Sequence, residues 1–166
     1  MGKVDITLNV NSRDWKISNV DHGDRLVDVL RERLGLTGTK KNCELGVCGL
    51  CTVHINGNAV SGCSVLAVDA VGVNIRTIED LYKDEKPHPV QEAFMEKNGY
   101  QCGFCTPGMI MSTVALLEEN SNPSEDEIRR ALVGNLCRCT GYESIVESVE
   151  AAAEKMSVAA MAKGGK

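Results

Sequence analysis

Eight cysteines in two complete sets of four constrain this chain more than any other feature of its sequence. The first set has the spacing C-x4-C-x2-C, followed after eleven residues by a fourth cysteine, which is the spacing of plant-type [2Fe-2S] ligands. The second set joins a C-x2-C pair to a distant C-x-C pair. The sets are Cys43, Cys48, Cys51 and Cys63, and Cys102, Cys105, Cys137 and Cys139. Each set predicts one metal centre.

Spacing alone leaves other uses of the cysteines open. A disulfide framework is disfavoured, because the chain opens without the charged region and apolar stretch that direct export to an oxidising compartment. Zinc stays open, since C-x2-C also occurs in zinc knuckles and redox dithiols, and C-x-C in other thiolate sites. The first set still favours iron, because common zinc spacings do not include x4-x2-x11. The three histidines lack the paired placement of a Rieske centre.

Composition limits what else the chain can do. Its 166 residues, 43% of them hydrophobic, suffice for one domain or two small ones, without a large catalytic domain. A net charge of -5 with scattered lysines and arginines argues against nucleic acid or an anionic membrane as a partner. Long apolar runs, nucleotide-binding glycine motifs and a Ser/His/Asp arrangement are missing from the sequence. We therefore expect a soluble, cytoplasmic protein without membrane insertion and without catalytic residues of its own.

The first half of the sequence has the pattern of a small α+β domain. Residues 4–10 alternate apolar and polar side chains, and Asn11-Ser12 turns this strand into a second one over 13–20. A helical stripe over 24–35 follows, and then the cysteine-bearing loop, whose Gly46 and Gly49 allow positive φ angles. A hairpin with Asn56-Gly57 at its turn returns the fourth cysteine toward the loop, and a last strand ends near Ile78. This order predicts a β-grasp domain.

The second half has helical periodicity. Four helices are predicted, beginning at Pro89, at Pro107 with Thr106 as N-cap, after a Ser124–Glu127 capping box, and after Thr140. In an up-down-up-down bundle the first and third connections lie at the same end, and these connections carry the second cysteine set. The predicted organisation is a β-grasp domain over 1–82, a linker over 83–88, a four-helix domain over 89–156 and a disordered tail over 157–166.

Three motifs together resemble a known family. They are C-E-L-G-V-C-G-L-C-T-V, Q-C-G-F-C-T-P-G-M-I-M and G-N-L-C-R-C-T-G-Y. They are similar to those of the small iron–sulfur subunit of molybdenum hydroxylases, a family that includes xanthine dehydrogenases, aldehyde oxidoreductases, aerobic-type carbon monoxide dehydrogenases and hydroxybenzoyl-CoA reductases. The resemblance covers residues 3–156 and implies a plant-ferredoxin-like β-grasp domain followed by a four-helix domain, each with one [2Fe-2S] cluster.

The resemblance also implies roles for individual residues. The first cysteine set matches the ligands of a cluster that lies toward the flavin of a partner, and the second matches the ligands of a buried cluster beside molybdopterin. Gln101 matches a glutamine that hydrogen-bonds the pterin, and Cys139 matches the ligand whose sulfur approaches the pterin amine. Leu50 departs from the family pattern, where a small residue, usually alanine, is expected, and this bears on packing over the first cluster.

The function implied is electron transfer without bond chemistry. The chain would relay electrons from a molybdopterin centre on a large partner subunit to FAD on a medium partner subunit, or to another acceptor. The implied assembly is a hetero-oligomer, such as a dimer of heterotrimers, without nucleic acid. Two alternatives stay open on the residues alone, a free-standing two-cluster ferredoxin and a zinc-stapled adaptor module.

Overall fold

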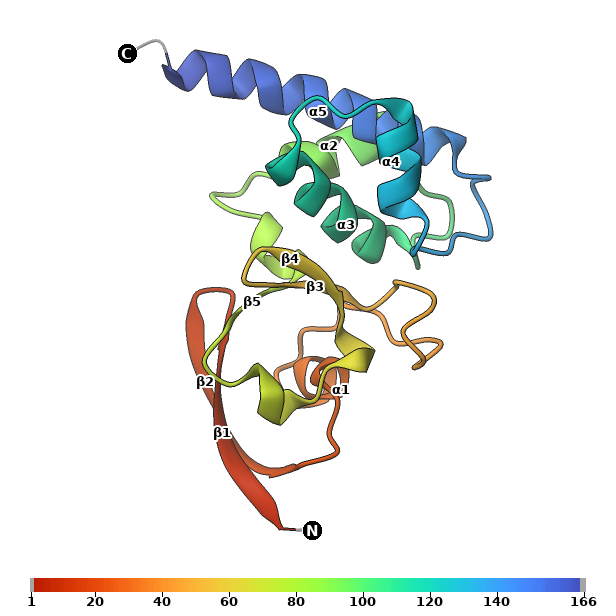
Figure 1. The fold of residues 1–166 in the computed structure, drawn as a ribbon. Coiled ribbons are helices and arrows are strands. Elements are labelled where there is room, and N and C mark those ends of the chain that lie inside the picture. The colour runs from red at the N-terminus through yellow and green to blue at the C-terminus, as the bar shows by residue number, and fades with distance from the viewer. Residues whose placement is uncertain (1, 165–166) are drawn as a thin grey trace.

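A computed structural model of the chain describes residues 2–164 and divides into a sheet-containing half and a helical half (Figure 1). The first half is a five-stranded mixed sheet in the order β2-β1-β5-β3-β4. Its strands are β1 Lys3–Val10, β2 Arg13–Asp21, β3 Thr52–Ile55, β4 Asn58–Ser61 and β5 Asn74–Arg76. The β1/β5 pair is parallel, and the other pairs are antiparallel. This is the β-grasp arrangement that the sequence predicts.

The two predicted turns form as expected. Asn11 and Ser12 have φ angles of 55° and 61°, and Asn56 and Gly57 have φ angles of 50° and 88°. Positive φ at both central residues matches the twist of the flanking strands. The predicted helix over 24–35 is a short α-helical turn, α1 Leu26–Asp28, that continues into a π-helical turn, η1 Val29–Arg33. Its apolar side packs on the sheet with the alternating buried residues of β1 and β2.

The helical half contains the four predicted helices. They are α2 Pro89–Glu96, α3 Thr106–Glu119, α4 Glu125–Leu132 and α5 Glu143–Gly164. The predicted capping box of α4 is present, with the Ser124 side chain accepting from the Glu127 N–H and Glu127 accepting from the Ser124 N–H. A second capping box, between His88 and Gln91, begins α2. Within the described residues, no helix is long and apolar enough to cross a membrane.

Two local predictions are wrong. Thr106 is the first residue of α3 rather than its N-cap, because Cys105 occupies the cap position and already has helical φ and ψ angles of -79° and -17°. The tail was expected to be disordered from residue 157, but α5 continues to Gly164. The alanine-rich run over 157–163 has good helix propensity and extends the preceding helix. Residues 165–166 of the predicted tail lie outside the described residues.

Each half has its own hydrophobic core. One core joins β1, β2, β5 and α1, and the other joins the four helices. Leu81 and Leu50 come from the first part of the chain but are buried in the helical core. The predicted linker contains a short turn in which Lys83 and Lys86 pair, and the division of domains at this segment stays a prediction.

The two halves are joined through α3, which lies against β3 and β4 (Figure 1). His54 Nε2 in β3 lies 2.7 Å from the carbonyl oxygen of Met111 in α3. Arg76 at the end of β5 donates to Glu118 at 2.8 Å. At the N-terminal end of α3, Gly108 packs on the carbonyl group of Gly49, which leaves no room for a Cβ atom. The first cysteine loop therefore rests directly on a helix of the second half.

Replacing Gly108 with alanine should destabilise the protein by about 1 to 3 kcal/mol, because the new methyl group collides with backbone that cannot move aside easily. Gly134→Ala is a matched control, since a Cβ there meets no atom within 4 Å. Denaturant unfolding of both variants measures the difference. Equal stability of the two variants would contradict a tight contact at Gly108.

Candidate metal centres

The first cysteine cage is a loop between η1 and β3, closed by Cys63 from the turn η2 Gly62–Ser64 that follows the β3–β4 hairpin. Glu44, Gly46 and Gly49 have φ angles of 58°, 72° and 64°, which turn successive backbone N–H groups inward. Four of these groups donate to sulfur, and their donor–sulfur distances lie between 3.3 and 3.4 Å. The pairs are Leu45 N and Cys48 N to Cys43 Sγ, Gly46 N to Cys63 Sγ, and Cys63 N to Cys51 Sγ.

These donors make the cage suitable for negative charge. The N–H of Leu45, with help from Cys48, lowers the pKa of the Cys43 thiol to about 6. Burial acts in the opposite direction on Cys51 and raises the pKa of its thiol to about 11. A buried thiolate at Cys51 therefore requires a cation among the sulfur atoms, which a metal centre supplies.

The second cage is formed by two connections at one end of the helical half. Cys102 and Cys105 precede α3, while Cys137 and Cys139 lie between α4 and α5. The Sγ atoms of Cys102 and Cys139 are 3.6 Å apart, so the bundle gathers the two pairs as its topology predicts. Burial raises the pKa of the Cys105 thiol to about 12, which again requires a cation for the thiolate. Cys105 caps α3, whose N-terminal dipole favours negative charge at this position.

In each cage the strongest side-chain interactions between thiols join them in twos. In the first cage Cys43 interacts with Cys48, and Cys51 with Cys63. In the second cage the pairs are Cys102 with Cys139 and Cys105 with Cys137. Within residues 2–164, no group of three or more Cys, His, Asp or Glu side chains is placed to hold a single metal ion. Two pairs of thiolates suit a two-iron cluster, in which each iron takes two, better than one tetrahedral zinc ion.

One edge of the second cage is open to solvent. Cys102, Cys139 and the neighbouring Gln101 are exposed, whereas Cys105 is buried. A hollow of about 390 Å³ lies at this edge, lined by residues of both connections and by Leu50. Leu50, which belongs to the loop of the first cage, thus also lines the second cage.

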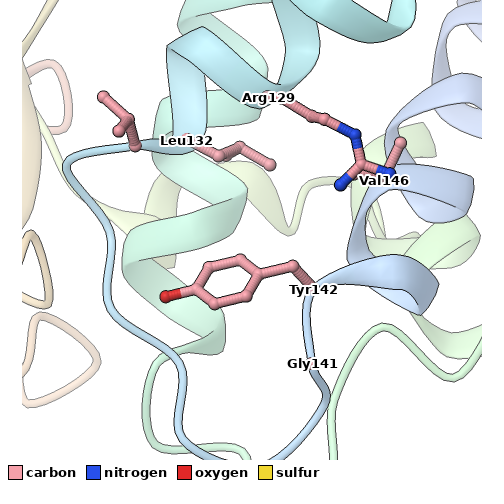
Figure 2. Close-up of a pocket in the computed structure, with 6 residues that line it drawn as sticks. Arg129, Leu132, Gly141, Tyr142 and Val146 are labelled. Carbon is pink, nitrogen blue, oxygen red and sulfur yellow. The ribbon is translucent and has the colours of Figure 1, made fainter.

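The structure adds a residue that the sequence analysis did not single out. Tyr142, at the start of α5, has a φ angle of 72°, and its ring lies beside the connection that carries Cys137 (Figure 2). Its hydroxyl accepts from the Cys137 N–H at 2.9 Å and donates to the Asn135 carbonyl oxygen at 3.2 Å. The Thr140 hydroxyl lies 3.2 Å from Cys137 Sγ and accepts from the Tyr142 N–H. In the sequence, Tyr142 could have been noticed because Gly141-Tyr142 directly follows the cysteine motif C-R-C-T.

Comparison with known protein families agrees with both cages. Residues 8–72 match a family model described as a 2Fe-2S iron-sulfur cluster binding domain, and residues 77–150 match one described as a [2Fe-2S] binding domain. Together these matches cover most of the chain and place one cysteine set in each domain.

Individual relatives cover nearly the whole chain. The nicotine 6-hydroxylase small subunit of Paenarthrobacter nicotinovorans is 49% identical over 89% of this chain and 88% of its own length. The nicotinate dehydrogenase small FeS subunit of Eubacterium barkeri is 45% identical over 93% and 98% of the two chains.

Solved structures share the fold. A chain of quinoline 2-oxidoreductase from Pseudomonas putida 86 has a TM-score of 0.87 and 42% identity, and 98% of it is covered. The aldehyde oxidoreductase of Desulfovibrio gigas has the same TM-score and 40% identity, but this chain covers only 17% of it. The chain belongs to the family of small iron–sulfur subunits of molybdenum hydroxylases.

Proposed function

We propose that this chain carries electrons between two partner subunits of a molybdenum hydroxylase through two [2Fe-2S] clusters. The proposed ligands are Cys43, Cys48, Cys51 and Cys63 for the first cluster, and Cys102, Cys105, Cys137 and Cys139 for the second. When bound, each cluster takes up and releases one electron. The observation that carries the proposal is the direct contact between two cages, each of which contains four cysteines.

The cages are connected through the backbone. The N–H of Leu136 donates to the carbonyl oxygen of Cys48 at 2.9 Å. Leu136 directly precedes Cys137, so one hydrogen bond links a ligand-bearing segment of the first cage to one of the second. A continuous path of covalent bonds and one hydrogen bond couples two redox centres better than a gap filled by solvent.

The outer edges of the two cages are the proposed partner surfaces. We assign the edge of the second cage, with Gln101 and Cys139, to a large molybdopterin-binding subunit, where Gln101 would hydrogen-bond the pterin. On the first cage, Leu45 and Val47 are 79% and 62% exposed beside the ligand Cys43, and we assign this edge to an FAD-binding subunit. Large exposed apolar side chains beside a redox centre are typical of an interface.

The names of the relatives support a multi-subunit assembly. Several are named as subunits, and this chain spans most of their length, which favours an obligate subunit of a hetero-oligomer, such as a dimer of heterotrimers, over a free-standing ferredoxin. The paired sulfur atoms argue against a zinc-stapled adaptor. We place the assembly in the cytoplasm, because a reducing compartment keeps the eight cysteines available as thiolates.

The purified protein should contain about four iron atoms and about four acid-labile sulfides per chain, with little zinc, because each cage suits one two-iron cluster. Metal analysis by mass spectrometry and a colorimetric sulfide assay measure these contents. Two zinc ions without sulfide would refute the assignment.

Cys43→Ser should damage the first cluster and leave the paramagnetic signal of the second, because Cys43 belongs only to the first cysteine set. Cys139→Ser is the reciprocal variant, since Cys139 is exposed at the outer edge of the second cage. Paramagnetic resonance of the reduced proteins identifies which signal is lost. If either change removed both signals from a folded protein, the partition of the ligands into two sets would be wrong.

Gln101→Ala should slow reduction of the clusters by substrate in the assembled complex, while the iron content stays unchanged, because Gln101 lies outside the ligand sets. Rapid freezing followed by paramagnetic resonance measures the rate. Asn122→Ala is a matched control, since Asn122 is an exposed amide at the opposite end of the helical half. An unchanged rate in Gln101→Ala would refute the assignment of this edge to the molybdopterin subunit.

A further inference from the structure

One buried amide joins the two cages. Asn135 lies in the connection after α4, two residues before Cys137, and its side chain is only 5% exposed. Each of its polar groups has a partner. Its N–H donates to the Leu132 carbonyl oxygen at 2.9 Å, and its carbonyl oxygen accepts from the Tyr142 hydroxyl at 3.2 Å. Both partners belong to the helical half, so the backbone of Asn135 is fixed there.

The side chain of Asn135 reaches the other half. Its Oδ1 accepts from the Ser112 hydroxyl in α3 at 2.8 Å, and its Nδ2 donates to the Gly49 carbonyl oxygen at 2.9 Å. Because the Gly49 carbonyl oxygen can only accept, the amide must turn its NH2 group toward Gly49 and its oxygen toward the Ser112 hydroxyl. A carboxylate at this position could still accept from Ser112, but it would place an oxygen against the Gly49 carbonyl and lose the donor.

The acceptor lies inside the first cage. Gly49 separates the ligands Cys48 and Cys51 together with Leu50, and its carbonyl oxygen also accepts from the Thr52 hydroxyl at 2.6 Å in the turn that begins β3. A Cβ atom at Gly49 would collide with the carbonyl oxygen of Gly134. The cages therefore meet backbone to backbone, and Asn135 is the side chain that bonds across this contact.

The adjacent residue makes the connection between the ligand segments. Leu136 donates its N–H to the Cys48 carbonyl oxygen, so a shift of Asn135 would also move the donor of this bond. Elsewhere the halves are held by the His54–Met111 contact and by the ion pair between Arg76 and Glu118. Loss of the Asn135 donor would loosen the contact between the cages without separating the halves.

We propose that Asn135 is a positioning residue that fixes the distance between the two cages and thereby the coupling between the centres they hold. This inference rests on the proposed function, because it needs both centres to be present. Asn135 lies outside both proposed partner surfaces and outside both sets of proposed cysteine ligands. The amide instead sets a geometry that electron transfer between the centres depends on.

The test is the magnetic interaction between the two centres in the full-length protein, with both clusters reduced by dithionite. At low temperature this interaction splits the paramagnetic signals, and its dipolar part falls with the cube of the separation. Asn135→Asp should give a smaller splitting with unchanged iron content. Thr113→Val is the matched control and should leave the splitting unchanged. Thr113 follows Ser112 in α3, and its buried hydroxyl has no hydrogen-bond partner within the described residues.

Ser112→Ala is the second variant, in case Asn135→Asp does not retain both clusters. It keeps Asn135 but removes the hydroxyl that holds the amide oxygen, so its splitting should also be smaller than that of the unmodified protein. Thermal unfolding is recorded for each variant, since a purely structural role would lower the unfolding temperature without changing the splitting.

The outcomes separate the two proposals. A splitting that stays unchanged in a variant retaining both clusters overturns the role of Asn135, whatever happens to thermal stability. Two signals without any splitting in the unmodified protein overturn it as well. If the unmodified protein holds no iron–sulfur signal, the proposed function itself fails. A smaller splitting in Asn135→Asp or Ser112→Ala, beside an unchanged one in Thr113→Val, supports the inference.

Discussion

The structure depends on the stabilisation of buried, negatively charged sulfur by backbone N–H groups and by the charge of a metal centre. Burial raises the pKa of the Cys51 and Cys105 thiols to about 11 and about 12, so without a cation these groups would stay protonated. The loop of the first cage uses backbone turns with positive φ to direct its N–H groups at Cys43 and its neighbours. A site of this kind couples metal binding to folding, because the ligands must lose protons and the loop must close in the same step.

The same cages also decide how the two halves meet. Gly108 on α3 and Gly49 in the first loop lack side chains where their backbones touch, and this allows the cysteine-bearing segments to approach closely. Leu50 fills the space beside this contact and joins the helical core. The halves are consequently one structural unit around the cages, although each keeps a hydrophobic core of its own.

Local signals predicted most of the fold. The turns at Asn11-Ser12 and Asn56-Gly57 and the Ser124–Glu127 capping box act over a few residues, so the sequence alone indicates them. The two local errors have separate causes. Cys105 already has helical φ and ψ angles, so α3 begins at Thr106. The good helix propensity of residues 157–163 lets α5 continue to Gly164.

The sequence by itself determined the two sets of four cysteines, the order of strands and helices, and the end of the bundle at which the second set gathers. Only the tertiary structure decided which sulfur atoms pair, such as Cys102 with Cys139, and that Asn135 and Tyr142 support the cages. The physical reason is the distance along the chain over which each signal acts. Spacing and periodicity report neighbours along the chain, whereas these contacts join segments that come together only when α3 packs against the sheet and the helices pack against one another.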